Sequence, residues 1–134
     1  MKSFVVVLQD AVGSETFDEV VSFVGEDASG SFGIQAGHAR IMTVLVAGLA
    51  RFRRQDGAWR YVGLPGALLY FAGGTLTLAA RRYVLGDDYS KISELLETQL
   101  LTEERELDSI KQGLQQMEEQ LLKRLWNLER RYAP

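Results

Sequence analysis

Short apolar runs separated by glycine and other turn-forming residues make up the first 86 positions of the chain. Strands bury apolar side chains in runs of four to eight residues, and repeated short runs between turn signals are typical of all-β folds. The runs are residues 4–8, 17–24, 41–46, 49–52, 59–62, 67–71 and 76–79. This pattern predicts an antiparallel β-sandwich or barrel.

Two glycine-containing pairs mark predicted hairpins. Asp56-Gly57 stands between two apolar runs, and this residue pair tolerates the positive φ angles of a type I′ turn. We therefore expect residues 51–54 to pair with residues 59–62. Gly73-Gly74 precedes a strictly alternating segment, residues 75–78, which predicts a strand with one buried and one solvated face.

The pattern changes after Gly86. Twelve of the thirteen glycines lie at or before that position, and no proline follows until Pro134. Leu, Glu, Gln, Lys and Arg dominate the remainder, and these residues favour helices. Asp87, Asp88 and Ser90 are suited to cap the start of the first helix. The predicted fold is therefore α+β: an antiparallel β-sandwich at residues 1–86, then an α-helical hairpin or an extended helical arm at residues 87–134.

Two apolar stripes at helical spacing run along this second segment. A polar stretch, residues 102–106, separates them, and Thr102 is a candidate cap for a second helix. A hairpin with a break near Thr102 and one uninterrupted rod both fit the sequence. The first stripe is Tyr89, Ile92, Leu95, Leu96 and Leu100; the second is Leu107, Ile110, Leu114, Met117, Leu121, Leu125, Leu128 and Tyr132.

The composition argues against catalysis. There is no cysteine and only one histidine, and neither a Walker-type phosphate loop nor a dinucleotide-binding glycine motif is present. We therefore predict no catalytic residue, no metal site and no cofactor.

The net charge of −3 gives no reason to expect nucleic-acid binding. One basic cluster fits a solvated strand face; it consists of Arg51, Arg53, Arg54 and Arg60. The apolar run at residues 4–8 is too short for a signal peptide or a membrane span.

The segment Ser-Phe-Gly-Ile-Gln-Ala-Gly-His-Ala-Arg-Ile-Met-Thr, residues 31–43, resembles the G-I-x-x-G-H-A core of ATP synthase epsilon subunits. The order of strands, this core, further strands and a helical arm supports the resemblance over almost the whole chain. Ala36 and Arg40 stand where the family usually has proline. This variant resembles the divergent epsilon subunits of the alternate, sodium-translocating ATPase class.

The resemblance implies a non-enzymatic subunit with a ten-stranded sandwich that binds the gamma subunit and sits on the membrane-embedded c-ring. Its expected location is peripheral, at the cytoplasmic face of the cell membrane, which it contacts only through the c-ring. By position, Ser29, Gly30, Ser31 and Phe32 are expected at the c-ring, although the family often has an acid where Ser31 stands. Gly37, His38 and Ala39 are expected near gamma. A histidine hydrogen-bonded in a tight turn explains His38 equally well.

In related subunits the helical arm folds down or extends toward the alpha and beta subunits and restrains ATP hydrolysis. The arm of this chain ends in four cations: Lys123, Arg124, Arg130 and Arg131. They suit acidic loops of the beta subunits, and they equally suit the negative end of a helix dipole. The D-x-x-R-A pattern that binds ATP in some relatives is absent at residues 88–92. The alternative function is a stand-alone sandwich binding module that dimerises through a coiled-coil arm.

Overall fold

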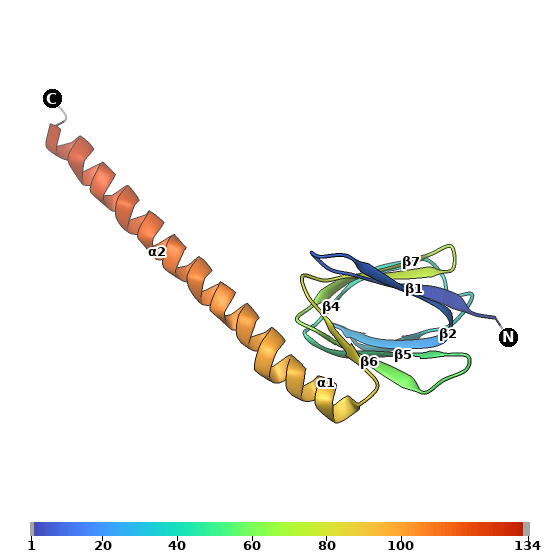
Figure 1. Ribbon diagram of the computed structural model, residues 1–134. Helices are drawn as coiled ribbons and strands as arrows, with labels where there is room; N and C mark the ends of the chain where they lie inside the picture. Colours follow the sequence, from blue (N-terminus) through green and yellow to red (C-terminus); the bar gives the residue numbers. More distant parts are fainter. Residues whose placement is uncertain (1, 133–134) are drawn as a thin grey trace. The chain divides into compact units, whose positions relative to one another are not determined.

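The computed structural model describes the backbone of residues 2–132 and the side chains of residues 2–128. The chain forms two compact units, residues 1–101 and residues 102–134, which are described separately below. The first unit contains every strand of the described chain, a short helix and a π-helical turn, and the second consists of the long helix. Figure 1 shows the strands of the first unit stacked in two layers.

Nine strands are present in the described residues. They are β1 (Phe4–Gln9), β2 (Ser14–Asp27), β3 (Gly30–Ile34), β4 (Ile41–Leu45), β5 (Gly48–Arg54), β6 (Trp59–Leu64), β7 (Ala67–Ala72), β8 (Thr75–Ala79) and β9 (Val84–Gly86). The family resemblance implied ten, so that expectation is corrected. The long strand β2 continues through an irregularity between Val20 and Ser22 as a single strand, and it pairs with β1 in its first half and with β5 in its second.

One layer contains β4, β7, β8, β1 and the first half of β2, and the other contains β3, the second half of β2, β5, β6 and β9. All pairings are antiparallel except that of β1 with β8, in which Val5 lies beside Thr75 and Val7 beside Thr77. The purely antiparallel sandwich expected from the sequence is therefore a mixed one. Because β1 and β8 are far apart in the sequence, no tight turn requires them to run in opposite directions.

The core lies between the two layers. Alternate residues of the strands point into it, and Phe23, Ile34, Phe52 and Leu69 are completely inaccessible to solvent. Burial of such side chains stabilises the fold by about 1.5–3 kcal/mol each relative to exposure. The apolar runs of the sequence are thus confirmed as strands. Two strands outside those runs, β3 and β9, were not predicted.

The predicted hairpin at Asp56-Gly57 exists, with Arg53 opposite Trp59, but its turn differs from the prediction. The Gly57 N–H donates to the Arg54 carbonyl over 3.2 Å, and neither Asp56 nor Gly57 has a positive φ. The expected type I′ turn is therefore wrong at this position. Positive φ angles at both central residues occur instead in the β7–β8 hairpin, at Gly73 and Gly74.

The predicted helix start is confirmed. Asp88 is the N-cap of α1 (Tyr89–Leu95), and its carboxylate accepts from the N–H groups of Ser90 and Lys91 over 3.0 and 3.3 Å. A π-helical turn, η1 (Leu96–Leu100), follows, and α2 (Leu101–Tyr132) continues to the end of the described backbone. The backbone remains helical through Thr102, so of the two predicted alternatives the structure shows the long helix and not the hairpin.

The helix α1 packs on strands β6 and β9. Ile92 and Leu96 are 4% and 7% exposed, and both lie against Gly63. For this reason the first compact unit reaches Leu101, whereas the change in composition suggested a boundary after Gly86.

Candidate functional site

Three connections lie together at one end of the sandwich: the β2–β3 turn, the β4–β5 connection and the β6–β7 turn. The pairing of Asp27 with Leu45 and of Leu45 with Ala67 brings them together. The Val46 N–H donates to the Glu26 carbonyl over 3.0 Å, which joins the first two connections directly. We call this set the loop end of the sandwich.

The β2–β3 turn is held by the carboxylate of Asp27. The Ser29 N–H donates to Asp27 Oδ1 over 2.9 Å, and the Ser29 hydroxyl donates to the same oxygen. Thr43 of β4 donates to Oδ2 over 2.8 Å. The hydrogen bonds from Ser29 and Thr43 hold the pKa of Asp27 below its ordinary value, because they favour the ionised carboxylate. Asp27 thus fixes the turn both internally and to the neighbouring layer.

The four residues expected at the c-ring occupy this turn and the start of β3, where they have different environments. Ser29 and Ser31 are exposed, and Gly30 takes a φ of 122° that glycine adopts without strain. Phe32 is half-buried and packs against the core. Position 31 holds a serine where an acid is frequent in the family. Glu26 of β2 lies directly opposite this serine.

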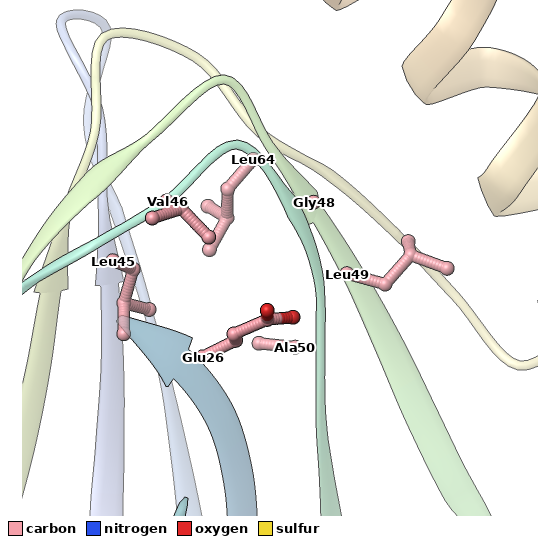
Figure 2. Close-up of a pocket in the computed structure, with 7 residues that line it drawn as sticks. All are labelled: Glu26, Leu45, Val46, Gly48, Leu49, Ala50 and Leu64. Carbon is pink, nitrogen blue, oxygen red and sulfur yellow. The ribbon is translucent and has the colours of Figure 1, made fainter. Parts of the chain in front are cut away.

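Glu26 borders a small hollow at the loop end (Figure 2). The hollow has a volume of about 10 Å³, which is about what one water molecule needs. The hollow is therefore too small to be a ligand site. Glu26 itself is exposed, so its carboxylate is available to a partner at the surface. The other lining residues are Leu45, Val46, Gly48, Leu49, Ala50 and Leu64.

The three residues expected near gamma lie in the turn that follows β3. Gly37 has a φ of 85°, and the His38 N–H donates to the Gln35 carbonyl over 3.1 Å. The His38 ring lies with Nδ1 2.7 Å from the carbonyl of Ala39 and approaches the Phe71 ring edge-on at 6.0 Å. All three residues expected near gamma are exposed. The structure therefore shows a hydrogen-bonded turn histidine with an accessible surface.

The sequence reasoning missed a larger feature beside this turn, on the outer side of β4, β7, β8 and β1. Met42 and Val44 are 64% and 66% exposed, and Leu68, opposite Val44, is 44% exposed. Tyr70 lies opposite Met42 and also beside Thr77, and Thr77 lies beside Val7 of β1. We call this surface the apolar face; it consists of Val5, Val7, Met42, Val44, Leu68, Tyr70, Thr75 and Thr77.

The apolar face carries no charged side chain among its eight residues, and such contiguous surfaces mark interaction sites. A signal for it is present in the sequence. Residues 67–72 are all apolar, and residues 41–45 are apolar except for Thr43, so apolar residues stand on both sides of each strand. A strand with one side in the core and the other in solvent alternates between apolar and polar residues. The lack of this alternation in β4 and β7 indicates that their outer side is covered.

The second unit, described by itself, is an amphipathic helix with an exposed stripe. Leu107, the first member of the stripe predicted from the sequence, is half-buried. The next six members are about half exposed or more: Ile110, Leu114, Met117, Leu121, Leu125 and Leu128. Leu122 and Trp126 widen it. Lys123 and Arg124 of the predicted basic tip are exposed, and the side chains of Arg130 and Arg131 lie outside the described residues.

Among the described residues no group of three or more acidic, histidine or cysteine side chains is arranged to hold a metal ion. Within residues 2–132, no helix combines the length and the apolar character that crossing a membrane requires.

Comparison with protein families gives a match that covers all nine described strands of the sandwich. Residues 4–86 match the model of the family described as "ATP synthase, Delta/Epsilon chain, beta-sandwich domain". The ATP synthase epsilon chain 2 of Cereibacter sphaeroides is 41% identical over 81 residues, which are 60% of this chain and 56% of that protein. The protein of the same name from Paraburkholderia xenovorans is 36% identical over 80 residues, 59% of this chain and 58% of that one. The aligned region thus spans a little over half the length of these relatives.

Solved structures with the same fold include a chain from the central stalk and c-ring of the Tetrahymena thermophila mitochondrial ATP synthase. It has a TM-score of 0.53 and 16% identity, and the match covers 62% of this chain and 66% of that one. A chain from the Euglena gracilis mitochondrial ATP synthase has a TM-score of 0.58 and 17% identity over 71% of this chain and 62% of that one. At these identities the likeness concerns the fold.

Proposed function

Since this chain belongs to the family of ATP synthase delta/epsilon chain β-sandwich domains, we propose that it acts as the epsilon subunit of an F-type ATP synthase. In this role it is a non-catalytic part of the central stalk, and it couples rotation of the gamma subunit to that of the c-ring. Its place is peripheral, at the cytoplasmic face of the cell membrane. The sequence of residues 37–43 leads us to propose the alternate, sodium-translocating class.

The apolar face is the observation that carries this proposal. A rotor subunit transmits torque through packed surfaces, and a permanent interface is formed by apolar side chains that solvent would otherwise contact. Met42, Val44 and Leu68 provide such a surface on strands of a close-packed sandwich, which is stiff. The turn with Gly37, His38 and Ala39 leads directly into β4, which carries Met42 and Val44. We therefore propose that gamma covers the apolar face and this turn together.

The loop end is the proposed contact with the c-ring. Ser29 and Ser31 are exposed there, and Asp27 holds the turn in place through hydrogen bonds. The family often has an acid at the position of Ser31 on β3. In this chain Glu26, directly opposite Ser31 on β2, supplies a carboxylate instead. An ionic contact with basic loops of the c-ring then comes from β2 instead of β3.

The arm is proposed to restrain ATP hydrolysis. Its exposed apolar stripe and basic tip suit a binding site between alpha and beta subunits, because apolar packing and complementary charge stabilise one docked state. The basic tip comprises Lys123, Arg124, Arg130 and Arg131.

The test of the central role is binding to the gamma subunit of the same ATP synthase. We expect co-expression to give a 1:1 complex that survives size-exclusion chromatography, with the mass measured by light scattering. Val44→Glu places a charge in the middle of the apolar face and is expected to weaken binding at least tenfold, because the carboxylate is buried unpaired. Gln55→Glu, in the β5–β6 turn, adds the same charge elsewhere and is the matched control.

Two results contradict the proposal. One is the absence of any complex with gamma while the chain is folded. The other is a stable dimer of this chain that forms through α2 and leaves gamma unbound, which is what the alternative binding module predicts.

A further inference from the structure

A π-helical turn interrupts the helical segment near the end of the first compact unit. This turn, η1, is five residues long, and the Leu101 N–H that closes it donates to the carbonyl of Leu96, five residues earlier. In a regular α-helix the same N–H would donate to the carbonyl of Glu97, four residues earlier. Such turns are rare and occur mostly singly, often at functional sites. The presence of η1 therefore calls for a physical cause.

The packing of the helical segment on strand β6 supplies this cause. Both α1 and η1 contact β6, and Ile92, Leu96 and Leu100 are 4%, 7% and 1% exposed. In a regular α-helix residues four apart are turned by about 40°, so Leu100 would point about 80° away from Ile92. The wider π-helical turn holds about one more residue, which brings Leu100 back toward the direction of Ile92. Burial of all three side chains thus favours the π-helical turn.

Thr98 supports the wider turn from within the helix. Its hydroxyl donates to the Glu94 carbonyl over 2.8 Å, and this carbonyl is the acceptor that the Thr98 N–H would use in a regular α-helix. Such a bond weakens α-helical geometry and often bends a helix. The hydroxyl bond is local and does not require the sheet, whereas burial of Leu100 does. The packing on β6 is therefore the contribution that a movement of the helix removes.

The contact of α1 with the sheet is separate from the core of the sandwich. Ile92 and Leu96 lie against Gly63 of β6, and Tyr89 contacts Tyr61 edge-on with ring centroids 5.5 Å apart. These helix side chains form no part of the apolar cluster between the two layers. The helix can therefore leave the sheet while that core stays closed.

Conversion of η1 to an α-helical turn changes the direction of every later side chain in the helix. The Leu101 N–H then bonds to Glu97, and the residues that follow turn about the helix axis by one residue's rotation, roughly 100°. The exposed stripe of α2, which includes Ile110, Leu121 and Leu128, belongs to these residues. Because an apolar stripe is about 100° wide, this rotation moves it to a different side of the helix.

We propose that the docking of α1 on β6 sets the rotational position of the α2 stripe through η1. The turn is π-helical while Leu100 is buried, and it becomes α-helical when α1 leaves the sheet. A molecule that binds the stripe in one rotational position and the contact of α1 with β6 therefore influence each other. This inference goes beyond the proposed function and does not depend on it, because it concerns the hydrogen bonds of one helix.

The test identifies the acceptor of the Leu101 N–H in the full, isotopically labelled chain. Scalar coupling through the hydrogen bond, measured by nuclear magnetic resonance, joins an amide nitrogen to the carbonyl carbon that accepts from it. In the parent chain we expect coupling of Leu101 to Leu96. The nuclear Overhauser effect between Leu96 and Gly63 shows in the same sample whether the helix is docked.

Two variants release the helix by different routes. Ile92→Glu places a charge in the apolar contact. Gly86→Val fills the space that Ile92 occupies and leaves every helix residue unchanged. In both variants we expect loss of the Overhauser effect and a change of the coupling partner of Leu101 to Glu97. Because the second variant alters only the sheet, a changed partner there comes from the lost contact.

Lys91→Glu is the matched control, since it places the same acid at the neighbouring, exposed position of α1. We expect it to keep both the Overhauser effect and the coupling of Leu101 to Leu96. The proposal is overturned if a released helix keeps this coupling, or if the docked parent couples to Glu97. Persistence of the sheet contact in both releasing variants also contradicts it, because the switch requires a contact that these substitutions break.

Discussion

The side chain of Ile92 lies directly on Gly86. A Cβ atom placed on this glycine would be 2.8 Å from Ile92 Cδ1, a distance at which one of the two must move. Gly63 also leaves room for a close contact, since a Cβ atom placed on it would lie 2.8 Å from Val84 and 3.5 Å from Ile92. The absence of two side chains therefore lets α1 reach the sheet and attaches the start of the helical segment to the sandwich.

Gly86→Ala is expected to loosen α1. Overpacking of a close contact costs about 1–3 kcal/mol, and here the strain falls on the helix contact. Urea unfolding should show a stability loss of about this size, and limited proteolysis should cleave faster near residues 87–101. Gly57→Ala is the matched control, because no atom lies within 4 Å of its Cβ position and its φ is not positive. Equal stability of the two variants would show that the contact is unimportant.

Asp27 is expected to make the loop end sensitive to acid. Its folded pKa is lowered, so the ionised form contributes stability above its ordinary pKa of 3.8, and this contribution is lost as the pH falls through the folded value. Asp27→Asn should therefore be less stable than the parent at neutral pH, and the difference should shrink below about pH 4. Thermal unfolding at several pH values measures it. A difference that stays constant down to pH 2 would contradict the assignment.

Tyr83 is expected to resist deprotonation. Burial raises its pKa above the ordinary value of 10, and its hydroxyl donates to Glu15 over 2.6 Å, which raises the pKa further. The neutral tyrosine contributes stability that is fully present below pH 10 and is lost as the pH rises through the folded pKa. Ultraviolet absorbance titration should find one of the five tyrosines ionising after the others. In Tyr83→Phe that late step should be missing, and its persistence would assign it to another residue.

Glu26→Gln is expected to weaken the contact with the c-ring. The substitution keeps the shape of the side chain and removes the charge that Glu26 presents opposite Ser31. In a reconstituted ATP synthase we expect ion pumping per ATP hydrolysed to fall, while binding to gamma stays unchanged. Asp56→Asn, in the β5–β6 turn, removes a charge at a position outside the loop end and serves as control. Unchanged coupling with Glu26→Gln would argue against an ionic contact there.

Neutralising the basic tip is expected to relieve inhibition of ATP hydrolysis. Replacing Lys123, Arg124, Arg130 and Arg131 by glutamine removes the proposed attraction to beta subunits, so the ATPase rate of the reconstituted complex should rise severalfold. Lys91→Gln with Lys111→Gln tests loss of charge elsewhere in the helical segment. If the rate is the same with and without the four cations, the arm does not act through its tip.

Local patterns were sufficient for much of the fold. The apolar runs predicted most strands, and Asp88 predicted the start of the helix, because hydrophobic periodicity and capping depend on neighbours in the chain. The residues 31–43 were sufficient to indicate the family. Turn chemistry was less decisive: Asp56-Gly57 predicted the right hairpin with the wrong turn, since the longer connection there does not require positive φ.

What depends on distant residues came only from the tertiary structure. The parallel pairing of β1 with β8, the apolar face across four strands and the contact of α1 with Gly63 and Gly86 each join residues from separate segments. The sequence by itself determined seven of the strands and the start of the helical segment, because those choices follow from local periodicity and capping. Which outer surfaces become continuous was decided by strand order and register, which no single segment encodes.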